Sequence, residues 1–168
     1  MKVPEGFRYL LDSRHGILCR SATIDYVMRA VISYKYTGVS IDDLERTLRV
    51  VYDSLISVGV DPFCIQFAKR DGEIEQKTPA EMMQDAFREI EASDMLFVIQ
   101  SSRDRSEGML MEVGYALARN MPVIIATHTS VRNTYLPDMT DQRIKYSSLY
   151  DLNKKILSHW SRAQVLTR

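Results

Sequence analysis

The sequence predicts an α/β fold, a doubly wound, flavodoxin-like three-layer sandwich with a five-stranded, mostly parallel sheet. Two observations lead to this prediction. Short apolar segments alternate with segments of helical periodicity, and the connections between them are short. Residues 95–99 and 122–126 are apolar throughout, which is typical of strands that are buried on both faces of a sheet.

The first elements follow a strand and helix pattern. Residues 30–34 predict a short buried strand, and residues 35–40 predict a turn. Ser40 is a candidate N-cap of a helix that ends at Gly59, with an apolar stripe of Leu44, Leu48, Val51 and Leu55. Residues 61–67 predict a second strand, and residues 69–77 predict a charged loop that is long enough to reach over a site.

The later elements continue the alternation. Thr78-Pro-Ala-Glu81 has the pattern of a capping box, and the helix that it begins carries a stripe of Met83, Ala86, Phe87 and Ile90. The strand at 95–99 and a loop at 101–107 come next, followed by a second apolar helix and the strand at 122–126. A short edge strand at 143–146 and a helix over 149–160 complete the fold.

Composition limits the function classes. The 168 residues fit one domain, residues 27–168, preceded by an N-terminal extension of unclear structure at 1–26. Because 22 basic residues balance 22 acidic ones, no overall field attracts nucleic acid polymers or anionic membranes, and a small-molecule ligand is favoured. The chain has no membrane-spanning run or signal-peptide core, so we expect a cytoplasmic protein.

The metal-ligating residue types are scattered. Cys19 and Cys64 lie in unrelated segments, and the three histidines form no cluster in the sequence. We therefore expect reduced thiols, no metal site and no cofactor.

Glu112 is the first candidate for a functional residue. It is the only charged residue between Glu107 and Arg119, in a predicted helix that is apolar on nearly every side. Such a helix is expected to be buried between layers or at a subunit contact, where a carboxylate costs several kcal/mol unless it is paired or used. The alternative is a carboxylate that reaches solvent through a gap in the packing.

Two loops form a candidate anion site. The loop after the first strand contains Lys35, Tyr36, Thr37, Gly38 and Ser40, and the loop at 101–108 places Ser106 at a helix N-terminus. Hydroxyls and free backbone amides at such positions bind phosphate without net protein charge. The alternative for each loop is an ordinary turn or helix cap.

One extended pattern resembles a known family. Ser93-Asp-Met-Leu-Phe-Val-Ile, followed by Ser106-x-Gly-x-x-x-Glu-x-Gly-x-Ala-x-Ala-x-x-x-Pro-Val-Ile, resembles the nucleoside 2-deoxyribosyltransferase superfamily, which includes the 2'-deoxynucleoside 5'-phosphate N-hydrolases. The resemblance runs from about residue 27 to residue 157. It implies a nucleoside or nucleotide as the small-molecule partner and cleavage of an N-glycosidic bond by hydrolysis or transfer.

The resemblance also implies residue roles. Glu112 corresponds to the glutamate that attacks the anomeric carbon, and Tyr34, or else Tyr36, to a tyrosine that orients it. Ser106 stands where the transferases have an aspartate and the monophosphate hydrolases have serine, and Gly108 and Met109 follow it in the phosphate-binding segment. Lys35 to Ser40 would complete the phosphate end of the site.

One position departs from the family pattern. The family has a base-contacting aspartate eight residues before the position of Asp94, and here that position is Ala86. Asp85 is adjacent, but it points about 200° away from the apolar stripe of its helix. Three alternatives remain for the group that protonates the leaving base. The helix is shifted by one residue so that Asp85 takes this role, another acid such as Asp71 takes it, or release of the base is impaired.

The resemblance further implies a homodimer or higher homo-oligomer, with Asn133 and Thr134 as candidates to reach a neighbouring subunit's site. Two other functions remain open from the sequence. One is a nucleotide-binding or sensing domain that has lost turnover, and the other is an NAD-cleaving domain of the TIR type.

Overall fold

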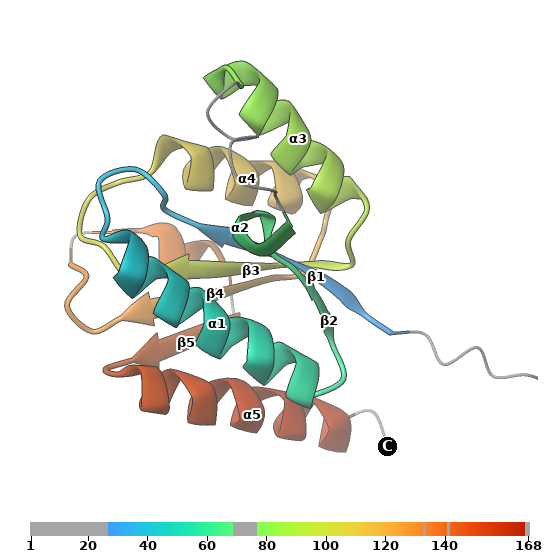
Figure 1. Cartoon of the computed structure of the whole chain (residues 1–168). Coiled ribbons are helices and arrows are strands. Elements are labelled where there is room, and N and C mark those ends of the chain that lie inside the picture. The colour runs from blue at the N-terminus through green and yellow to red at the C-terminus, as the bar shows by residue number, and fades with distance from the viewer. Residues whose placement is uncertain (1–26, 69–76, 133, 141, 167–168) are drawn as a thin grey trace, which may run out of the picture.

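The computed structural model describes residues 27–68, 77–132, 134–140 and 142–166. The predicted extension at 1–26, most of the charged loop with Asp71, and Asn133 lie outside these residues. Figure 1 shows strands and helices alternating along the chain. The strands are β1 (Arg29–Tyr34), β2 (Asp61–Phe63), β3 (Met95–Gln100), β4 (Val123–His128) and β5 (Gln142–Tyr146). The helices are α1 (Ile41–Ser57), α2 (Ile65–Ala68), α3 (Pro79–Glu91), α4 (Glu107–Ala118), the 3₁₀ helix η1 (Leu136–Met139) and α5 (Leu149–Leu166).

The sheet has the strand order β2-β1-β3-β4-β5, and every pairing is parallel. This is the flavodoxin-like order, in which ligands bind beyond the carboxyl ends of the strands near the β1 and β3 switch point. The prediction of a mostly parallel five-stranded sheet is confirmed. The last helix extends six residues beyond the predicted end at residue 160.

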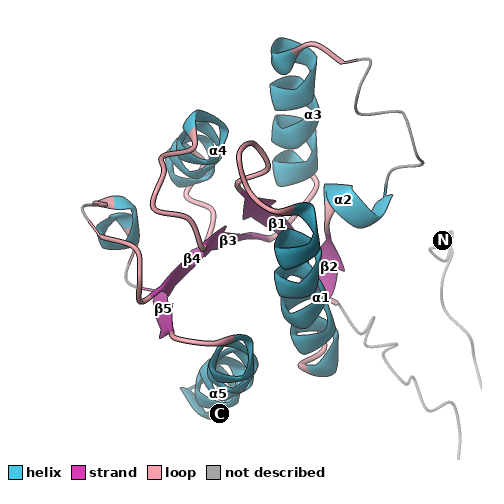
Figure 2. Ribbon diagram, turned by 60° about the vertical axis from the view of Figure 1, so that its left-hand side comes forward, coloured by secondary structure: helices cyan, strands magenta, loops and turns pink. Residues whose placement is uncertain are grey.

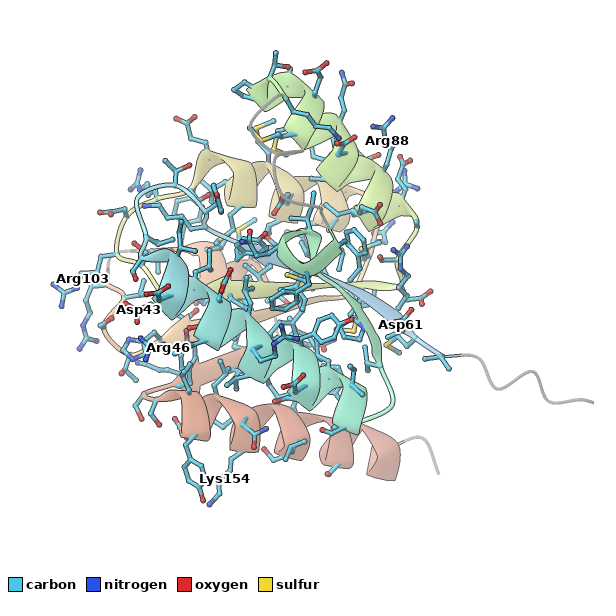
Figure 3. The ribbon with its side chains drawn as sticks, in the orientation of Figure 1. Asp43, Arg46, Asp61, Arg88, Arg103 and Lys154 are labelled. Atoms are coloured by element: carbon cyan, nitrogen blue, oxygen red, sulfur yellow. The ribbon has the colours of Figure 1, made fainter. Side chains whose placement is uncertain are left out.

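Helices cover both faces of the sheet. Figure 2 shows α1 and α5 on one face and α3 and α4 on the other. Strand residues alternate between the two cores: Ile32 packs in the core under α1 and α5, whereas Val31 packs in the core under α3 and α4. Charged side chains such as Arg46, Arg88 and Arg103 project from the outside of the molecule (Figure 3).

The second strand is shorter than predicted. Pairing with β1 ends at Phe63, and the chain then turns into α2, whose Phe67 packs edge-on against Tyr52 of α1 with ring centroids 5.4 Å apart. A continued strand would carry this ring away from α1, so tertiary packing overrides the apolar run at 61–67.

The capping predictions are confirmed. Ser40 accepts a hydrogen bond from the backbone N–H of Asp43 at the start of α1, and Thr78 and Glu81 form the predicted capping box at the start of α3. Within the described residues, no helix combines the length and apolar character needed to cross a membrane. The same residues contain no group of three His, Cys, Asp or Glu side chains that could hold a metal ion.

Candidate functional site

Helix α4 places Glu112 beside Ser33, near the carboxyl end of β1. Its buried side chains, Met109, Val113 and Ala116, pack on the sheet, and Ser106 caps its N-terminus by accepting a hydrogen bond from the backbone N–H of Met109. The opposite face is open in this chain, where Met111 is 49% exposed and Gly114 is exposed. Within the single chain α4 is therefore an outer layer of the fold and is not buried between two layers, and burial of its outer face at a subunit contact stays a prediction.

Ser33 donates a hydrogen bond to Oε2 of Glu112. Ser33 belongs to β1 and is 3% exposed, on the strand face that looks toward α3 and α4. Burial raises the pKa of the Glu112 carboxyl to about 7, while the hydrogen bond from Ser33 favours the ionised form and limits the rise. The result is a carboxylate that ionises near neutral pH and whose orientation is fixed by a buried hydroxyl.

Glu112 lies in the wall of a cleft of about 580 Å³. The floor includes Val31 and Ser33 of β1, and the walls come from α3, α4 and the segment around α2. Apolar atoms form most of the cleft surface, and the apolar lining residues are Val31, Ile32, Phe63, Ile65, Pro79, Met82, Met83, Ala86, Met109 and Met111. A largely apolar cleft that also carries polar groups is the usual form of a small-molecule site.

Tyr34 lines the same cleft, but among the described residues the hydrogen bond to the Glu112 carboxylate comes from Ser33. Burial raises the pKa of the Tyr34 hydroxyl well above its ordinary value, and the charges of Cys64 and Glu112 raise it further. The phenol is therefore a neutral donor at any physiological pH. The direct contact that we expected from Tyr34 is made by Ser33, because successive strand residues point to opposite faces.

The predicted loop residues separate into two groups. Lys35, Tyr36 and Thr37 line the cleft, as do Ser106, Gly108 and Met109 from the start of α4. Gly38 and Ser40 do not line it: Gly38 supplies the positive φ of 74° in the turn, and Ser40 caps α1. Gly108 faces Met83 of α3, and a Cβ at this position would lie in ordinary van der Waals contact with Sδ of Met83, at 3.6 Å.

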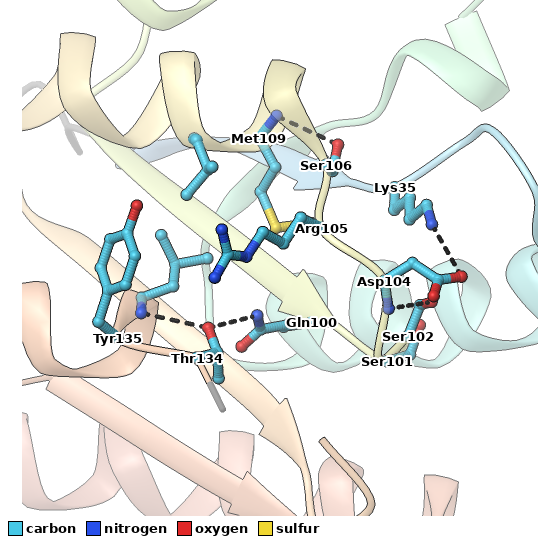
Figure 4. Close-up of a pocket in the computed structure, with 12 residues that line it drawn as sticks. Lys35, Gln100, Ser101, Ser102, Asp104, Arg105, Ser106, Met109, Thr134 and Tyr135 are labelled. Atoms are coloured by element: carbon cyan, nitrogen blue, oxygen red, sulfur yellow. Dashed lines mark hydrogen bonds and ion pairs between the residues drawn. The ribbon is translucent and has the colours of Figure 1, made fainter. Parts of the chain in front are cut away.

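A smaller pocket of about 30 Å³ adjoins the cleft where Lys35, Arg105 and Ser106 line both (Figure 4). Lys35 Nζ lies 3.3 Å from a carboxylate oxygen of Asp104, and Thr134 accepts a hydrogen bond of 2.9 Å from Gln100. Figure 4 shows the Arg105 side chain extending away from the Lys35–Asp104 pair, with its guanidinium toward Thr134, Gln100 and Tyr135. Arg105 lines both the pocket and the cleft, and among the described residues it has no charged partner.

Asp85 lies outside the cleft. It forms ion pairs with Lys77 at 2.5 Å and with Arg88, and the Lys77 and Arg88 hydrogen bonds lower the pKa of its carboxyl. Ala86 lines the cleft instead. Ala86, the residue at the position of the family's aspartate, is therefore the one that faces the cleft. The helix is not shifted by one residue, and Asp85 stays outside the cleft.

Sequence reasoning missed three residues of this site. Ser33 looked like a small residue within an apolar strand, but a buried hydroxyl requires a partner, and this signal could have identified it. Arg105 and Glu89 also line the cleft. Glu89 lies on the same face of α3 as Ala86 and one turn later, a spacing that the sequence contained.

No protein-family model and no curated protein matches this chain. Several solved structures share its fold. A conserved protein from Enterococcus faecalis V583 is 17% identical with a TM-score of 0.55, and the match covers 79% of this chain and 99% of that one. The CMP N-glycosidase of Clostridium botulinum is 14% identical with a TM-score of 0.56, covering 76% of this chain and 96% of its own.

A 2-deoxyribosyltransferase from Bacillus psychrosaccharolyticus is also 14% identical with a TM-score of 0.56, and the match covers 74% of this chain and 90% of that one. The fold is thus shared with an N-glycosidase and a 2-deoxyribosyltransferase, and this architecture is the one that the sequence resemblance implies. Identities this low establish the architecture and leave the chemistry to the residues of this cleft.

Proposed function

We propose that this protein cleaves the N-glycosidic bond of a deoxynucleoside or a deoxynucleoside 5'-monophosphate, with Glu112 as the nucleophile. The observation that carries the proposal is the Ser33-bound carboxylate of Glu112 in the wall of an apolar cleft. A carboxylate with little water around it is a competent nucleophile toward an oxocarbenium-like anomeric carbon.

The reaction divides into two displacements. The ionised Glu112 carboxylate attacks C1' and forms an ester, while the glycosidic C–N electron pair leaves with the base, which takes a proton from solvent. Water, or a second base in a transfer reaction, then attacks C1' and releases the Glu112 carboxylate. The hydrogen bond from Ser33 holds the attacking oxygens in place through both steps.

The polar groups near the start of α4 support a phosphate end. Ser106 precedes Glu112 by six residues, about 9 Å along a helix axis, and helical side chains tilt toward the N-terminus, so the carboxylate lies closer than that. The free amides of the first turn, the Arg105 guanidinium and the hydroxyls of Tyr36 and Thr37 can donate to phosphate oxygens.

Base release tests this proposal. The protein is incubated with each deoxynucleoside and each 5'-monophosphate, and free base is measured by chromatography. We expect release from at least one substrate, and loss of at least a thousandfold in Glu112→Gln, because the amide cannot form the ester. Glu45→Gln, which changes an exposed carboxyl on α1, is the matched control. Release that persists in Glu112→Gln would remove Glu112 from the mechanism.

A nucleotide-binding domain without turnover is the second candidate. The observation that favours it is Ala86, which puts a methyl group in the cleft where the resembled family has a carboxyl. Nucleotide-dependent thermal stabilisation together with no release of base from any substrate would select this function over the enzyme.

We further propose that the protein acts as a homodimer or higher homo-oligomer. The exposed apolar side chains of Met111 on α4 and of Tyr135 and Met139 near η1 support it. Thr134, the described member of the two cross-subunit candidates, is already hydrogen-bonded to Gln100 within its own chain. Sedimentation equilibrium measures the oligomeric state directly.

A further inference from the structure

Glu89 lies at the end of the cleft that is far from the phosphate-binding groups. It pairs with Arg29, the first residue of β1, whereas Lys35 follows the last residue of β1. The six residues of β1 separate these two ends by about 16 Å. A nucleotide that places its phosphate near Lys35 and its anomeric carbon near Glu112 therefore directs its base along the cleft toward Glu89.

The Glu89 carboxylate is held in place by a preorganised partner. Arg29 donates to Oε2 of Glu89 at 2.9 Å and to the backbone carbonyl of Ala92 at 3.1 Å. Its guanidinium also lies over the ring of Phe63, 5.0 Å from the centroid, and Phe63 itself lines the cleft. These contacts fix the Glu89 side chain, which keeps 32% of its surface exposed.

One oxygen of Glu89 is available to a ligand. Within the described part of the chain, Oε2 has its Arg29 partner and Oε1 has none. A carboxylate in an ion pair accepts hydrogen bonds and donates none. At the edge of a base it accepts from the exocyclic amino group of cytosine or adenine, whereas uracil and hypoxanthine present an acceptor oxygen there.

We infer that Glu89, held by Arg29, selects nucleotides whose base carries an exocyclic amino group on its pairing edge, such as cytosine and adenine. This inference rests on the proposed function, since it requires a nucleotide in the Glu112 cleft. Glu89 acts through recognition of the base and takes no part in bond cleavage. Phe63, beside it, offers an aromatic surface to the same base.

Binding to two matched nucleotide pairs tests the inference. Dissociation constants are measured by calorimetry for dCMP against dUMP and for dAMP against dIMP, with Glu112→Gln in every protein so that no ligand is consumed. We expect about tenfold tighter binding of the amino member of each pair. Glu89→Gln, whose amide can donate to an oxo group, is expected to bring the ratio close to one while keeping a hydrogen bond to Arg29.

Glu91→Gln is the control, because Glu91 is an exposed carboxyl on the same helix that bonds to Tyr115 outside the cleft. It should keep the wild-type ratios. Thermal melting checks that both variants fold, and Glu89→Asp, which retains the charge, should restore part of the preference.

Two results overturn the inference in distinguishable ways. In the first, the nucleotides bind, but Glu89→Gln leaves the ratio of dissociation constants within each pair unchanged. Glu89 then does not select the base, and the proposed function stands. If none of the four nucleotides binds, the proposed function fails, and the inference fails with it.

Discussion

Ser33 and Glu112 are 79 positions apart in the sequence and are joined by a hydrogen bond in which the Ser33 hydroxyl donates to the Glu112 carboxylate. The serine comes from the face of the sheet that α3 and α4 cover, and the glutamate comes from α4. The bond thus joins the sheet to a covering helix, and the first two predictions concern this pair.

Ser33→Ala should shift the pH dependence of base release. Loss of the hydrogen bond removes the influence that lowers the Glu112 pKa, so this pKa should rise above about 7 by about one unit. The rising limb of kcat/KM against pH, measured on an unphosphorylated deoxynucleoside, should move to higher pH by the same amount. Ser54→Ala, a buried serine of α1 outside the cleft, is the control. An unmoved limb in Ser33→Ala would contradict this role.

Glu112→Gln should stabilise the protein above neutral pH. In the folded state the carboxyl keeps its proton up to a pKa of about 7, against 4.5 in the unfolded chain, so stability falls as pH rises between these values. The variant should gain about 2 to 3 kcal/mol relative to wild type at pH 8, and much less at pH 5. Urea unfolding at the two pH values measures the gap, with Glu107→Gln, exposed on the same helix, as control. A gap of equal size at both pH values would count against burial of the charge.

Arg105→Met should weaken the phosphate end selectively. Loss of a charge-assisted hydrogen bond to phosphate should raise KM for a 5'-monophosphate about tenfold and leave KM for the deoxynucleoside unchanged. Arg103→Met removes an exposed arginine that bonds to the Ser130 carbonyl and should change neither value. Equal losses on both substrates would place Arg105 outside the phosphate site.

Asp85→Ala should leave base release intact. Its carboxylate is paired with Lys77 and Arg88 on the outer side of α3, so the variant should lose less than about 1 kcal/mol of stability. Parallel steady-state kinetics and thermal melting of the variant and wild type check both expectations. A large kinetic loss without unfolding would restore Asp85 as a catalytic acid.

Ala86→Asp should accelerate release of the base. A carboxyl at this cleft position, near Glu89 and among apolar side chains, would retain its proton and could donate it to the leaving base. We expect single-turnover release to rise about tenfold or more, and Ala86→Asn to give no such gain. A slower reaction in Ala86→Asp would show that this chain does not accommodate an acid there.

Much of the fold could be predicted from the sequence because its signals are local. The capping box at Thr78 and the apolar runs at 95–99 and 122–126 each specify an element without reference to distant residues. The second strand was predicted too long because its end depends on the packing of Phe67 against Tyr52, a contact between separate elements.

For the site as well, features with a local signal could be predicted from the sequence, and features that depend on contacts between separate elements could not. Glu112 became a candidate because a lone charge in an apolar helix is visible in the sequence, and helical geometry predicted that Asp85 would lie outside the cleft, where the structure has it paired with Lys77. Ser33 and Glu89 were missed because their roles depend on which strand or helix face meets the cleft. That information appears only when β1, α3 and α4 are assembled.

The early end of β2 has a consequence for how such a cleft arises. From Ile32 onward β1 pairs with β3 but not with β2, whose register stops at Phe63. The open strip along the remaining part of β1 is where Ser33 meets Glu112 and where Ile65 and Gln66 of α2 form the facing rim. The width of the cleft therefore depends on where β2 ends and α2 begins, and an insertion at that turn would change the size of the cleft without moving Ser33 or Glu112.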